Sequence, residues 1–385
     1  MPAHNTDELF LRRALDLARQ GIGLTSPNPC VGAVVVDGNG EVVGTGSHTY
    51  DGRKHAEILA LEQAGGKARG ATLYINLEPC SHQGRTPPCV DALIAAGISR
   101  VVACMQDPNP QVSGQGFARL RSAGIDVSTG ILEEQAKTLN ESFAEYIRHH
   151  IPLVTLKAAM TLDGKIAPPQ RKLPGPAAPA QDRGKWITGE PARTHVQELR
   201  HQHDAILVGI GTVIADDPLL TDRSGRPRRR PLLRVVLDSR LRLPLDSRLA
   251  KTAENDVLVL CSFVEEKKKE QLLKLGVRVE QLPAAASDGR LDIAAAVRFL
   301  GQMEITSLMI EGGALVNAAA LASGIVDKVF LYYAPRILGG TTSVPFAGGP
   351  GFASMGDAAC VNSIRLHRFG GDFAVEGYLK DPYTD

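Results

Sequence analysis

The chain has 385 residues, and its 43 Lys and Arg against 42 Asp and Glu leave a formal net charge of +1 at pH 7. This length favours two domains, and the balanced charge gives no electrostatic support for nucleic acid as the main partner. No apolar run has the length of a membrane span, and residues 1–20 follow a helical pattern without the apolar core of a signal peptide. We therefore expect a cytoplasmic protein without a membrane partner.

The first 150 residues alternate predicted helices and strands. A helix capped by Asn5 or Thr6 comes first, followed by a β-hairpin over 33–46. Further strands are expected at 71–77, 100–105 and 125–129, and further helices at 55–64, 90–96, 116–123 and 133–148. Strands and helices that alternate with short connections predict an α/β layer rich in parallel strands, whose ligands gather at strand ends.

Four residues in this half have the types and spacing of a catalytic zinc site. His55, Cys80 and Cys89 would fill three tetrahedral positions and leave the fourth to water, and Glu57 would serve as general acid and base. His-x-Glu followed by Pro-Cys and a second Cys is typical of zinc deaminases. Taken singly, these residues would be ordinary surface or core positions, but their conjunction favours a metal site.

The other four cysteines do not indicate a disulfide framework. We expect all of them to be buried thiols: Cys30, Cys104, Cys261 and Cys360.

Three polar residues near the predicted zinc ligands are candidates for substrate binding. Asn28, between two prolines, could present its amide to a ring edge, although an ordinary turn asparagine is the alternative. His82 and Arg85, in the polar loop between the zinc cysteines, could contact a hydroxyl or a phosphate. A solvated loop is the alternative interpretation.

The second half starts at Ile151-Pro152 and again alternates strands and helices. Strands are expected at 153–159, 205–209, 233–237, 256–261, 277–282, 307–310 and 326–334, and helices at 190–203, 292–303 and 314–323. The Pro- and Ala-rich residues 168–180 are expected to form a flexible loop, and the basic run 226–234 a solvated one, although it could attract a cofactor phosphate. Glu311-Gly312-Gly313 offers bare backbone N–H groups to a phosphate, but a tight turn is the simpler reading.

Several segments resemble the bacterial RibD family. In the first half they are Thr25–Gly32, His55–Glu57, Leu77–Cys89 and Met105–Gly114; in the second half they are Thr161–Ala167, Trp186–Thr188, Asp204–Val213, Asp216–Thr221 and Glu311–Gly313. Members of this family are bifunctional enzymes of riboflavin synthesis, with a diaminohydroxyphosphoribosylaminopyrimidine deaminase and a 5-amino-6-(5-phosphoribosylamino)uracil reductase. The spacing of eight residues between the two cysteines, which departs from Cys-x-x-Cys, is normal in this family.

The resemblance implies an α/β fold of two domains. Residues 1–150 would form a three-layer domain similar to cytidine deaminase, and residues 151–385 a domain similar to dihydrofolate reductase. It also implies two cofactors, Zn²⁺ and NADPH. The NADPH contacts carried over from the family are Ala159, Trp186, Thr212, Asp216, Ser239, Gly313, Ala314, Leu315, Val316, Asn317, Ala318 and Ala319. The substrate contacts in this domain are Arg200, Leu220, Arg223 and Glu311, and the two arginines suit a clamp on a ribose phosphate.

The implied reactions are hydrolytic deamination of a phosphorylated pyrimidine, followed by reduction of its ribosyl chain. Lys157, Asp163 and Asp216 are candidates for proton handling in the reduction, and the sequence does not choose among them. One departure from the family is Gly184, at the place of a serine that contacts substrate. The resemblance also implies a homo-oligomer that pairs through the reductase domain. A nucleic-acid-editing deaminase and a regulatory protein with a relic zinc site are the rival interpretations.

Overall fold

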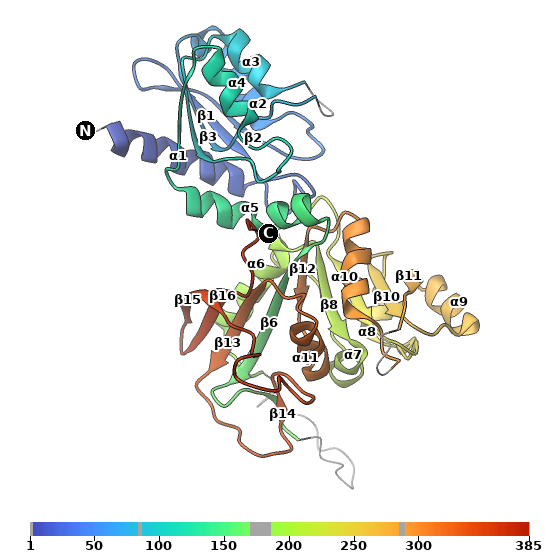
Figure 1. The fold of residues 1–385 in the computed structure, drawn as a ribbon. Helices are drawn as coiled ribbons and strands as arrows, with labels where there is room; N and C mark the ends of the chain where they lie inside the picture. Colours follow the sequence, from blue (N-terminus) through green and yellow to red (C-terminus); the bar gives the residue numbers. More distant parts are fainter. Residues whose placement is uncertain (1–2, 84–86, 170–185, 285–288, 385) are drawn as a thin grey trace. The chain divides into compact units, whose positions relative to one another are not determined.

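The computed structural model in Figure 1 describes residues 3–83, 87–169, 186–284 and 289–384. These residues divide into two compact units, one made of residues 1–150 with 227–230, and one made of residues 151–226 with 231–384. Within the described ranges, no helix combines the length and apolar character needed to cross a membrane.

The first unit is built on a five-stranded sheet with the order β2-β1-β3-β4-β5. Its strands are β1 (Gly32–Val36), β2 (Val42–Ser47), β3 (Thr72–Leu77), β4 (Arg100–Met105) and β5 (Asp126–Thr129). The hairpin β1–β2 and the pair β1–β3 are antiparallel, whereas β3, β4 and β5 run parallel. Because β3 and β4 are parallel neighbours, the residues that follow both strands lie at the same edge of the sheet.

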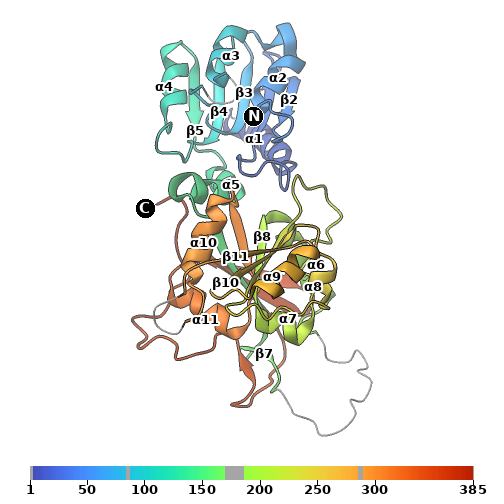
Figure 2. The same cartoon turned by 90° about the vertical axis from the view of Figure 1, so that its right-hand side faces the viewer.

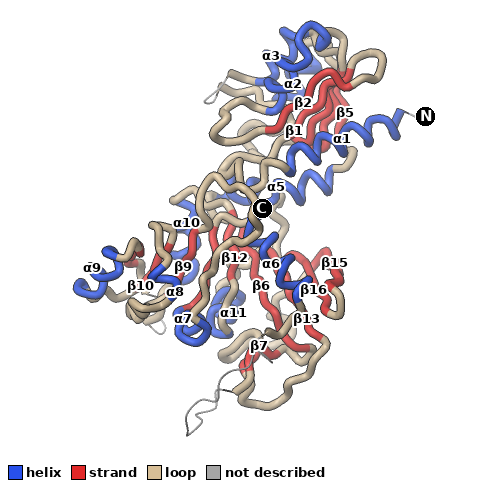
Figure 3. Tube along the Cα trace, turned by 180° about the vertical axis from the view of Figure 1, so that it is seen from behind, coloured by secondary structure: helices blue, strands red, loops and turns tan. Residues whose placement is uncertain are grey.

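Helices cover both faces of this sheet, as Figure 3 shows for α1, α2 and α3. They are α1 (Ala3–Arg19), α2 (Ala56–Ala64), α3 (Cys89–Ala96), α4 (Gln115–Ser122) and α5 (Glu133–His149), with a short 3₁₀ helix at Gly65–Ala68. The side chains of β3 alternate between the faces: Leu73 and Ile75 join the core beneath α2, α3 and α4, while the Tyr74 hydroxyl bonds Asp7 of α1. The predicted three-layer domain is confirmed.

The second unit is built on a nine-stranded sheet with the order β11-β10-β9-β8-β12-β6-β13-β16-β15. These strands are β6 (Leu153–Thr161), β8 (Ala205–Gly209), β9 (Leu233–Leu237), β10 (Val257–Cys261), β11 (Val277–Gln281), β12 (Ser307–Ile310), β13 (Lys328–Ala334), β15 (Asn362–Phe369) and β16 (Asp372–Tyr378). The seven strands from β11 to β13 are parallel, and β16 and β15 continue the sheet antiparallel. Separately, β7 (Lys165–Ala167) pairs with β14 (Val344–Pro345).

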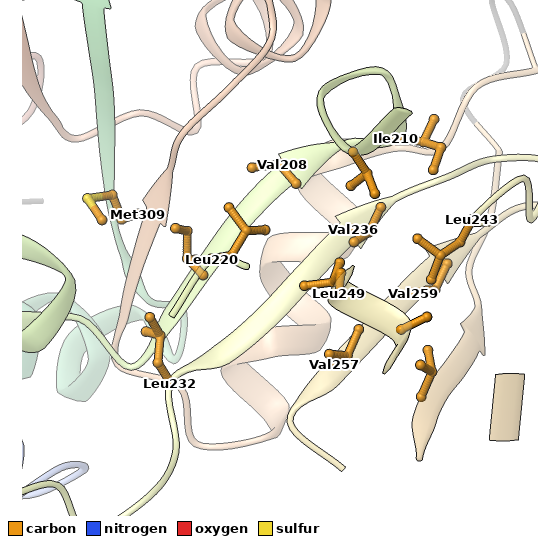
Figure 4. Close-up of a cluster of buried hydrophobic side chains, with 14 of the residues drawn as sticks. Val208, Ile210, Leu220, Leu232, Val236, Leu243, Leu249, Val257, Val259 and Met309 are labelled. Atoms are coloured by element: carbon orange, nitrogen blue, oxygen red, sulfur yellow. The ribbon is translucent and has the colours of Figure 1, made fainter. Parts of the chain in front are cut away.

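Apolar cores fill both faces of the large sheet, which Figure 2 shows between α10 and α11 on one side and α7 and α8 on the other. Along β8, Ile206 and Val208 join the core with α6 (Glu190–Gln202), α7 (Ile210–Asp216), α8 (Arg248–Lys251) and α9 (Glu266–Lys274). Leu207 joins the opposite core, with α10 (Ile293–Gln302) and α11 (Ala314–Ala322). Figure 4 shows the first of these cores. A sheet buried on both faces explains the continuous apolar runs of its strands.

Some expectations about local structure were wrong. The first helix begins at Ala3, so Asn5 and Thr6 lie inside it and do not cap it. The last two strands, β15 and β16, were missed; β15 is exposed along most of its length and so lacks the buried apolar run that marks the other strands. Cys360 is exposed, in a segment without regular structure. Most of the Pro- and Ala-rich segment, residues 170–180, lies outside the described residues, as does Gly184.

The glycines of β2 let α2 approach the backbone of the strand closely. A Cβ atom at Gly46 would stand 2.1 Å from the carbonyl oxygen of Ala56, in the first turn of α2. We predict that Gly46→Ala displaces this turn, destabilises the first unit by about 1–3 kcal/mol and weakens metal retention. Thermal unfolding and zinc content measure the effect. Gly38→Ala is the matched control because its Cβ meets nothing within 4 Å; equal losses in both variants would contradict the prediction.

Candidate active site

The three predicted zinc ligands come together in the first unit from three different elements. His55 immediately precedes α2, Cys80 follows β3, and Cys89 is the first residue of α3. Their donor atoms all lie within 4.8 Å of one another. The His55 Nδ1 atom is 3.1 Å from the Cys89 sulfur and 3.5 Å from the Cys80 sulfur.

The electrostatics of the two thiols favour a bound cation. A hydrogen bond from the Cys89 thiol, with further help from His55 and the Cys89 backbone N–H, lowers the pKa of Cys80 to about 4. The backbone N–H of Cys89 donates to the Cys80 sulfur at 3.3 Å. The same shared proton raises the pKa of Cys89. Two sulfurs and an imidazole joined by hydrogen bonds are a donor set that a metal ion can take over by displacing the protons between them.

These donors fit zinc in particular. Zn–S bonds of about 2.3 Å and Zn–N bonds of about 2.0–2.1 Å place tetrahedral ligand atoms roughly 3.5–3.8 Å apart, close to the spacing of these donor atoms. One nitrogen and two sulfurs leave a fourth position for a reactant, as in catalytic rather than structural zinc sites.

Glu57 lies in the first turn of α2, two residues after His55, and is only 3% exposed. Burial, followed by the negative charge of Cys80, raises the pKa of its carboxyl group. A carboxyl group with a raised pKa exchanges protons more readily near neutral pH than an exposed glutamate does. Its position beside the ligands agrees with the predicted role of general acid and base.

Asn28 is held by a histidine that the sequence interpretation missed. His48 is 4% exposed, and its Nδ1 lies 2.9 Å from the carbonyl oxygen of Lys54. Nδ1 must therefore carry the proton, which leaves Nε2 to accept from the Asn28 amide at 3.0 Å. This orientation turns the Asn28 NH₂ group towards His48. The ring of His48 also meets that of His55 edge to face, with centroids 5.5 Å apart.

Two buried asparagines fix the loop that carries Asn28. The Asn140 side chain bonds both the N–H and the carbonyl of Cys30, at 2.8 and 3.1 Å. Asn76, on β3, accepts from the N–H of Gly32 and donates to the Cys30 carbonyl, both at 2.9 Å. The loop therefore takes its position from β3, the strand that also leads to Cys80.

The buried carboxylate of Glu78 organises the loop that follows β4. Glu78 accepts from the backbone N–H groups of Asp107, Gly114, Gly116 and Phe117 at 2.8–3.2 Å. Burial raises the pKa of Asp107 to about 6, with opposing influences from Glu78 and His82. Asp107 therefore lies close enough to the site to interact with Cys80. The motif Met105–Gly114 contains it, but the sequence did not predict a role for Asp107 itself. His82 is exposed, and Arg85 lies outside the described residues.

In the second unit, several predicted cofactor contacts gather at the carboxyl ends of neighbouring parallel strands. Ser239 follows β9, Thr212 follows β8 in α7, Gly313 follows β12, and Ala159 lies near the end of β6. These four strands are adjacent in the order β9-β8-β12-β6. The N–H of Gly209 bonds the Gly312 carbonyl at 3.2 Å, so two of these junctions meet directly. Ligands of open α/β sheets bind at such an edge.

The turn before α11 has the geometry of a phosphate cradle. Gly312 and Gly313 have φ values of 69° and 96°, in the region that favours glycine. A Cβ at Gly312 would lie 2.4 Å from Asn317 Oδ1. The backbone therefore approaches the nine-residue α11 closely, and the first N–H groups of a helix, which have no partner within it, can bind an anion.

The remaining predicted cofactor contacts differ in their exposure to solvent. Leu315, Trp186 and Asp216 are exposed, as is Ala319, whereas Ala314, Val316 and Ala318 are half-buried. Asn317 is 1% exposed, and its side chain donates to the Phe346 carbonyl at 2.7 Å. This side chain is therefore buried beneath the Gly312–Gly313 turn and stabilises it. The Ser239 hydroxyl accepts from the N–H of Leu291. The cofactor role of each residue stays a prediction.

Three charged side chains form a buried cluster beside the Gly-Gly turn. The Arg200 guanidinium binds both oxygens of Glu311 at 2.7 and 2.9 Å and the Thr221 carbonyl at 2.9 Å. Lys157 Nζ lies 3.7 Å from Glu311. Burial alone would raise the pKa of Glu311, but Arg200 and Lys157 outweigh it and lower that pKa to about 2. Burial lowers the pKa of Lys157.

This arrangement bears on the predicted substrate contacts. Because Glu311 and Thr221 occupy the guanidinium of Arg200, this arginine holds Glu311 in place in the observed geometry. Arg223 is exposed and stays available for a phosphate. The Leu220 side chain points into the core in Figure 4 and is 4% exposed, so only its backbone could face a substrate.

Comparison with known proteins gives a family match for each of the two units. The model described as cytidine and deoxycytidylate deaminase zinc-binding region matches residues 4–105, and the RibD C-terminal domain model matches residues 152–372. The chain is 42% identical over 378 residues to riboflavin biosynthesis protein RibD of Actinobacillus pleuropneumoniae, covering 98% of this chain and 96% of that protein. The chain belongs to the RibD family. The Escherichia coli RibD is 40% identical, covering 96% of this chain and 98% of that protein.

Solved structures of RibD proteins have the same fold. Acinetobacter baumannii RibD aligns with a TM-score of 0.80 at 35% identity, covering 97% of this chain and 99% of that chain. The diaminohydroxyphosphoribosylaminopyrimidine deaminase/5-amino-6-(5-phosphoribosylamino)uracil reductase of Thermotoga maritima aligns with a TM-score of 0.79 at 36% identity, with the same coverage. The expected combination of a zinc-binding deaminase domain and a reductase domain is therefore confirmed for this RibD-family chain.

We predict that Cys80→Ser removes zinc from the purified chain, because a serine hydroxyl does not replace the thiolate that zinc prefers. Metal analysis should show the loss of about one zinc per chain. Cys360→Ser is the matched control because Cys360 is exposed and outside the donor cluster. Full zinc content in Cys80→Ser would contradict the assignment of this ligand.

Proposed function

We propose that the chain is a bifunctional enzyme of riboflavin synthesis. The first unit deaminates 2,5-diamino-6-(5-phosphoribosylamino)pyrimidin-4(3H)-one to 5-amino-6-(5-phosphoribosylamino)uracil, and the second unit reduces the ribosyl chain of this product to a ribityl chain. The observation that carries the proposal is the cluster of His55, Cys80 and Cys89 beside the buried Glu57. The name of the Thermotoga relative specifies the same two reactions for that protein.

In the deamination, His55, Cys80 and Cys89 would hold the zinc ion. Bound zinc supplies a Lewis acid that lowers the pKa of water towards about 7. Glu57 takes a proton from the attacking water, passes it to the ring nitrogen and then delivers a proton to the departing ammonia. Asn28, oriented by His48, holds the ring edge, and His82 and Arg85 bind the phosphorylated arm.

In the reduction, NADPH would be held by the turn Gly312–Gly313, the start of α11, and the residues at the ends of β6, β8 and β9. NADPH supplies the hydride, which the product receives at C1′ of the ribose in its ring-opened imine form. The imine nitrogen must gain a proton in the same reaction. Arg223 contributes to binding of the substrate phosphate, and Glu311 orients the substrate beside Lys157.

Among the three candidates for this proton, the structure favours Lys157. Asp163 accepts from the Thr161 hydroxyl and from the N–H groups of Leu338 and Gly339, and these bonds lower its pKa to about 2. It therefore stays ionised and has no proton to give at neutral pH. Asp216 is exposed at the end of α7. Lys157 is buried beside Glu311 with a lowered pKa, which makes it a stronger acid than an exposed lysine.

The rival functions receive less support. An editing deaminase would need a basic, aromatic-rich surface for nucleic acid, and the chain instead has a formal net charge of +1 and a complete reductase unit. A relic zinc site would have no need of a buried carboxylate such as Glu57.

We also propose a cytoplasmic location and pairing of two chains through the reductase unit. A reducing compartment keeps Cys80 and Cys89 available for zinc. The edge strand β15 exposes Ile364 and Leu366, at 58% and 72%, beside its unpaired edge. Light scattering on the purified chain measures its mass; a monomer at every concentration would rule out the pairing.

Product analysis tests the function directly. With zinc and the diaminopyrimidine substrate, the product should gain about one mass unit, because an oxygen and its proton replace an amino group. A further gain of about two mass units should require NADPH. Release of ammonia from cytidine or tRNA in preference to this substrate would contradict the proposal.

We predict that Glu57→Gln keeps zinc but lowers the deamination rate by at least about 100-fold, because proton transfer contributes 10²–10⁴-fold to such reactions. The same variant should still reduce 5-amino-6-(5-phosphoribosylamino)uracil that is supplied ready-made. Glu62→Gln, on the exposed side of α2, is the control. Normal ammonia release from Glu57→Gln would remove this residue from the mechanism.

For the reductase we predict that Lys157→Met lowers the rate by roughly 100-fold or more while deamination stays unchanged. Because its pKa is lowered, Lys157 loses its proton at a lower pH than an ordinary lysine, whose pKa is about 10.4. As the pH rises, the wild-type rate should therefore begin to fall before the pH reaches that value. NADPH oxidation measures both effects. Lys267→Met, on the exposed side of α9, is the control; an unchanged rate in Lys157→Met would return the choice to Asp216.

A further inference from the structure

A four-residue segment from the second half of the sequence belongs to the first unit. Residues 227–230 lie between β8 and β9 in the chain, yet they cluster with residues 1–150. Three of the four are arginines. The sequence interpretation treated them as part of a solvated loop, but Arg228, Arg229 and Arg230 are all half-buried.

Arg229 makes two contacts that join separate parts of the deaminase unit. Its backbone N–H donates to the Gly23 carbonyl at 2.9 Å. Its guanidinium carbon lies 4.0 Å from the ring centroid of Tyr50, the distance of a close cation–π contact. The Arg229 Nε atom is buried and has no hydrogen-bond partner among the described residues. The contact with the Tyr50 ring is therefore a favourable interaction for this half-buried charge.

Arg230 extends the contact along the same loop. Its guanidinium donates to the Ser26 hydroxyl at 3.2 Å, two residues before Asn28. The Arg228 side chain bonds the Arg230 carbonyl at 3.2 Å, which gives the segment a compact shape. Arg229 and Arg230 therefore contact residues 23–26 directly, and Arg228 bonds within the segment.

The two regions that Arg229 joins are those that build the substrate side of the zinc site. Residues 23–28 lead to Asn28, and Tyr50 follows the buried His48 by two positions. The N–H of Tyr50 donates to the Leu24 carbonyl at 3.1 Å, and the Asn28 amide bonds His48 at 3.0 Å. Neither region is a helix or a strand, so their relative position depends on contacts of this kind.

We propose that Arg229 is a positioning residue of the deaminase, and that it acts through Tyr50 and Gly23 on the placement of Asn28. The proposal rests on the deaminase function proposed above. Arg229 does not touch the zinc ligands, so its loss should affect how well the pyrimidine binds more than the chemical step. It also means that a segment encoded within the reductase sequence is needed for full deaminase efficiency.

The test compares full-length variants under steady-state conditions. Arg229→Ala should raise the KM for the diaminopyrimidine roughly threefold to thirtyfold, in line with the loss of a partly desolvated cation–π contact. The kcat, the zinc content and the reduction of ready-made aminouracil should stay within about twofold of wild type. Arg229→Lys, which keeps a cation over the ring, should recover most of the affinity. Arg226→Ala is the matched control because Arg226 is exposed three residues earlier.

Tyr50 provides an independent check if Arg229→Ala folds poorly. Tyr50→Leu removes the aromatic face and should reproduce the rise in KM, whereas Tyr50→Phe keeps the face and should not. An unchanged KM in both Arg229→Ala and Tyr50→Leu would overturn the proposal. Equal losses of kcat, zinc and reductase activity would also overturn it, because they would indicate a general structural role. Absence of deamination in the wild-type chain would instead reject the proposed function.

Discussion

The carboxylate of Glu78 accepts four backbone N–H groups at the edge where β3 and β4 end. This single buried charge holds the loop after β4 against the residues that follow β3, and those residues include Cys80. A carboxylate with four N–H donors is well solvated by the protein itself, so its burial is tolerated. The segment that carries Cys80, the Asp107 loop and the start of α4 are consequently joined at one edge of the sheet.

The reductase unit also places its predicted ligand contacts where parallel strands end, but for a different ligand. Neighbouring parallel strands end at one edge, and here the residues at that edge are glycines and small polar groups instead of thiols. The Gly312–Gly313 turn leads into the N-terminus of α11, which suits a phosphate and would not suit a metal ion. Two units with a similar architecture thus bind chemically different cofactors because different residue types follow their strands.

Much of this could be predicted from the sequence, because buried parallel strands are continuous apolar runs and each zinc ligand lies at, or within three residues of, the end of a regular element. Asn28, Glu57 and Glu311 stand in motifs that a family resemblance recognises. His48 could not be found this way, because it lies in an irregular segment and its importance comes from a hydrogen bond to Asn28. Arg229 is about 200 residues from the loop that it contacts, and no local pattern predicts such a pairing. Cys360 was misplaced because the burial of a cysteine depends on its tertiary surroundings.

The two catalytic regions also use buried carboxylates in opposite ways. Burial and the adjacent thiolate raise the pKa of Glu57, which suits the proton transfers proposed for this group. Glu311 is also buried, but the positive charges of Arg200 and Lys157 keep it ionised. In the proposed reduction it would therefore hold Lys157 and the substrate in position, and Lys157, whose pKa is lowered by burial, would supply the proton. Glu57 and Glu311 are both buried, so burial does not distinguish them. The charges beside each carboxyl group decide whether its pKa is raised or lowered.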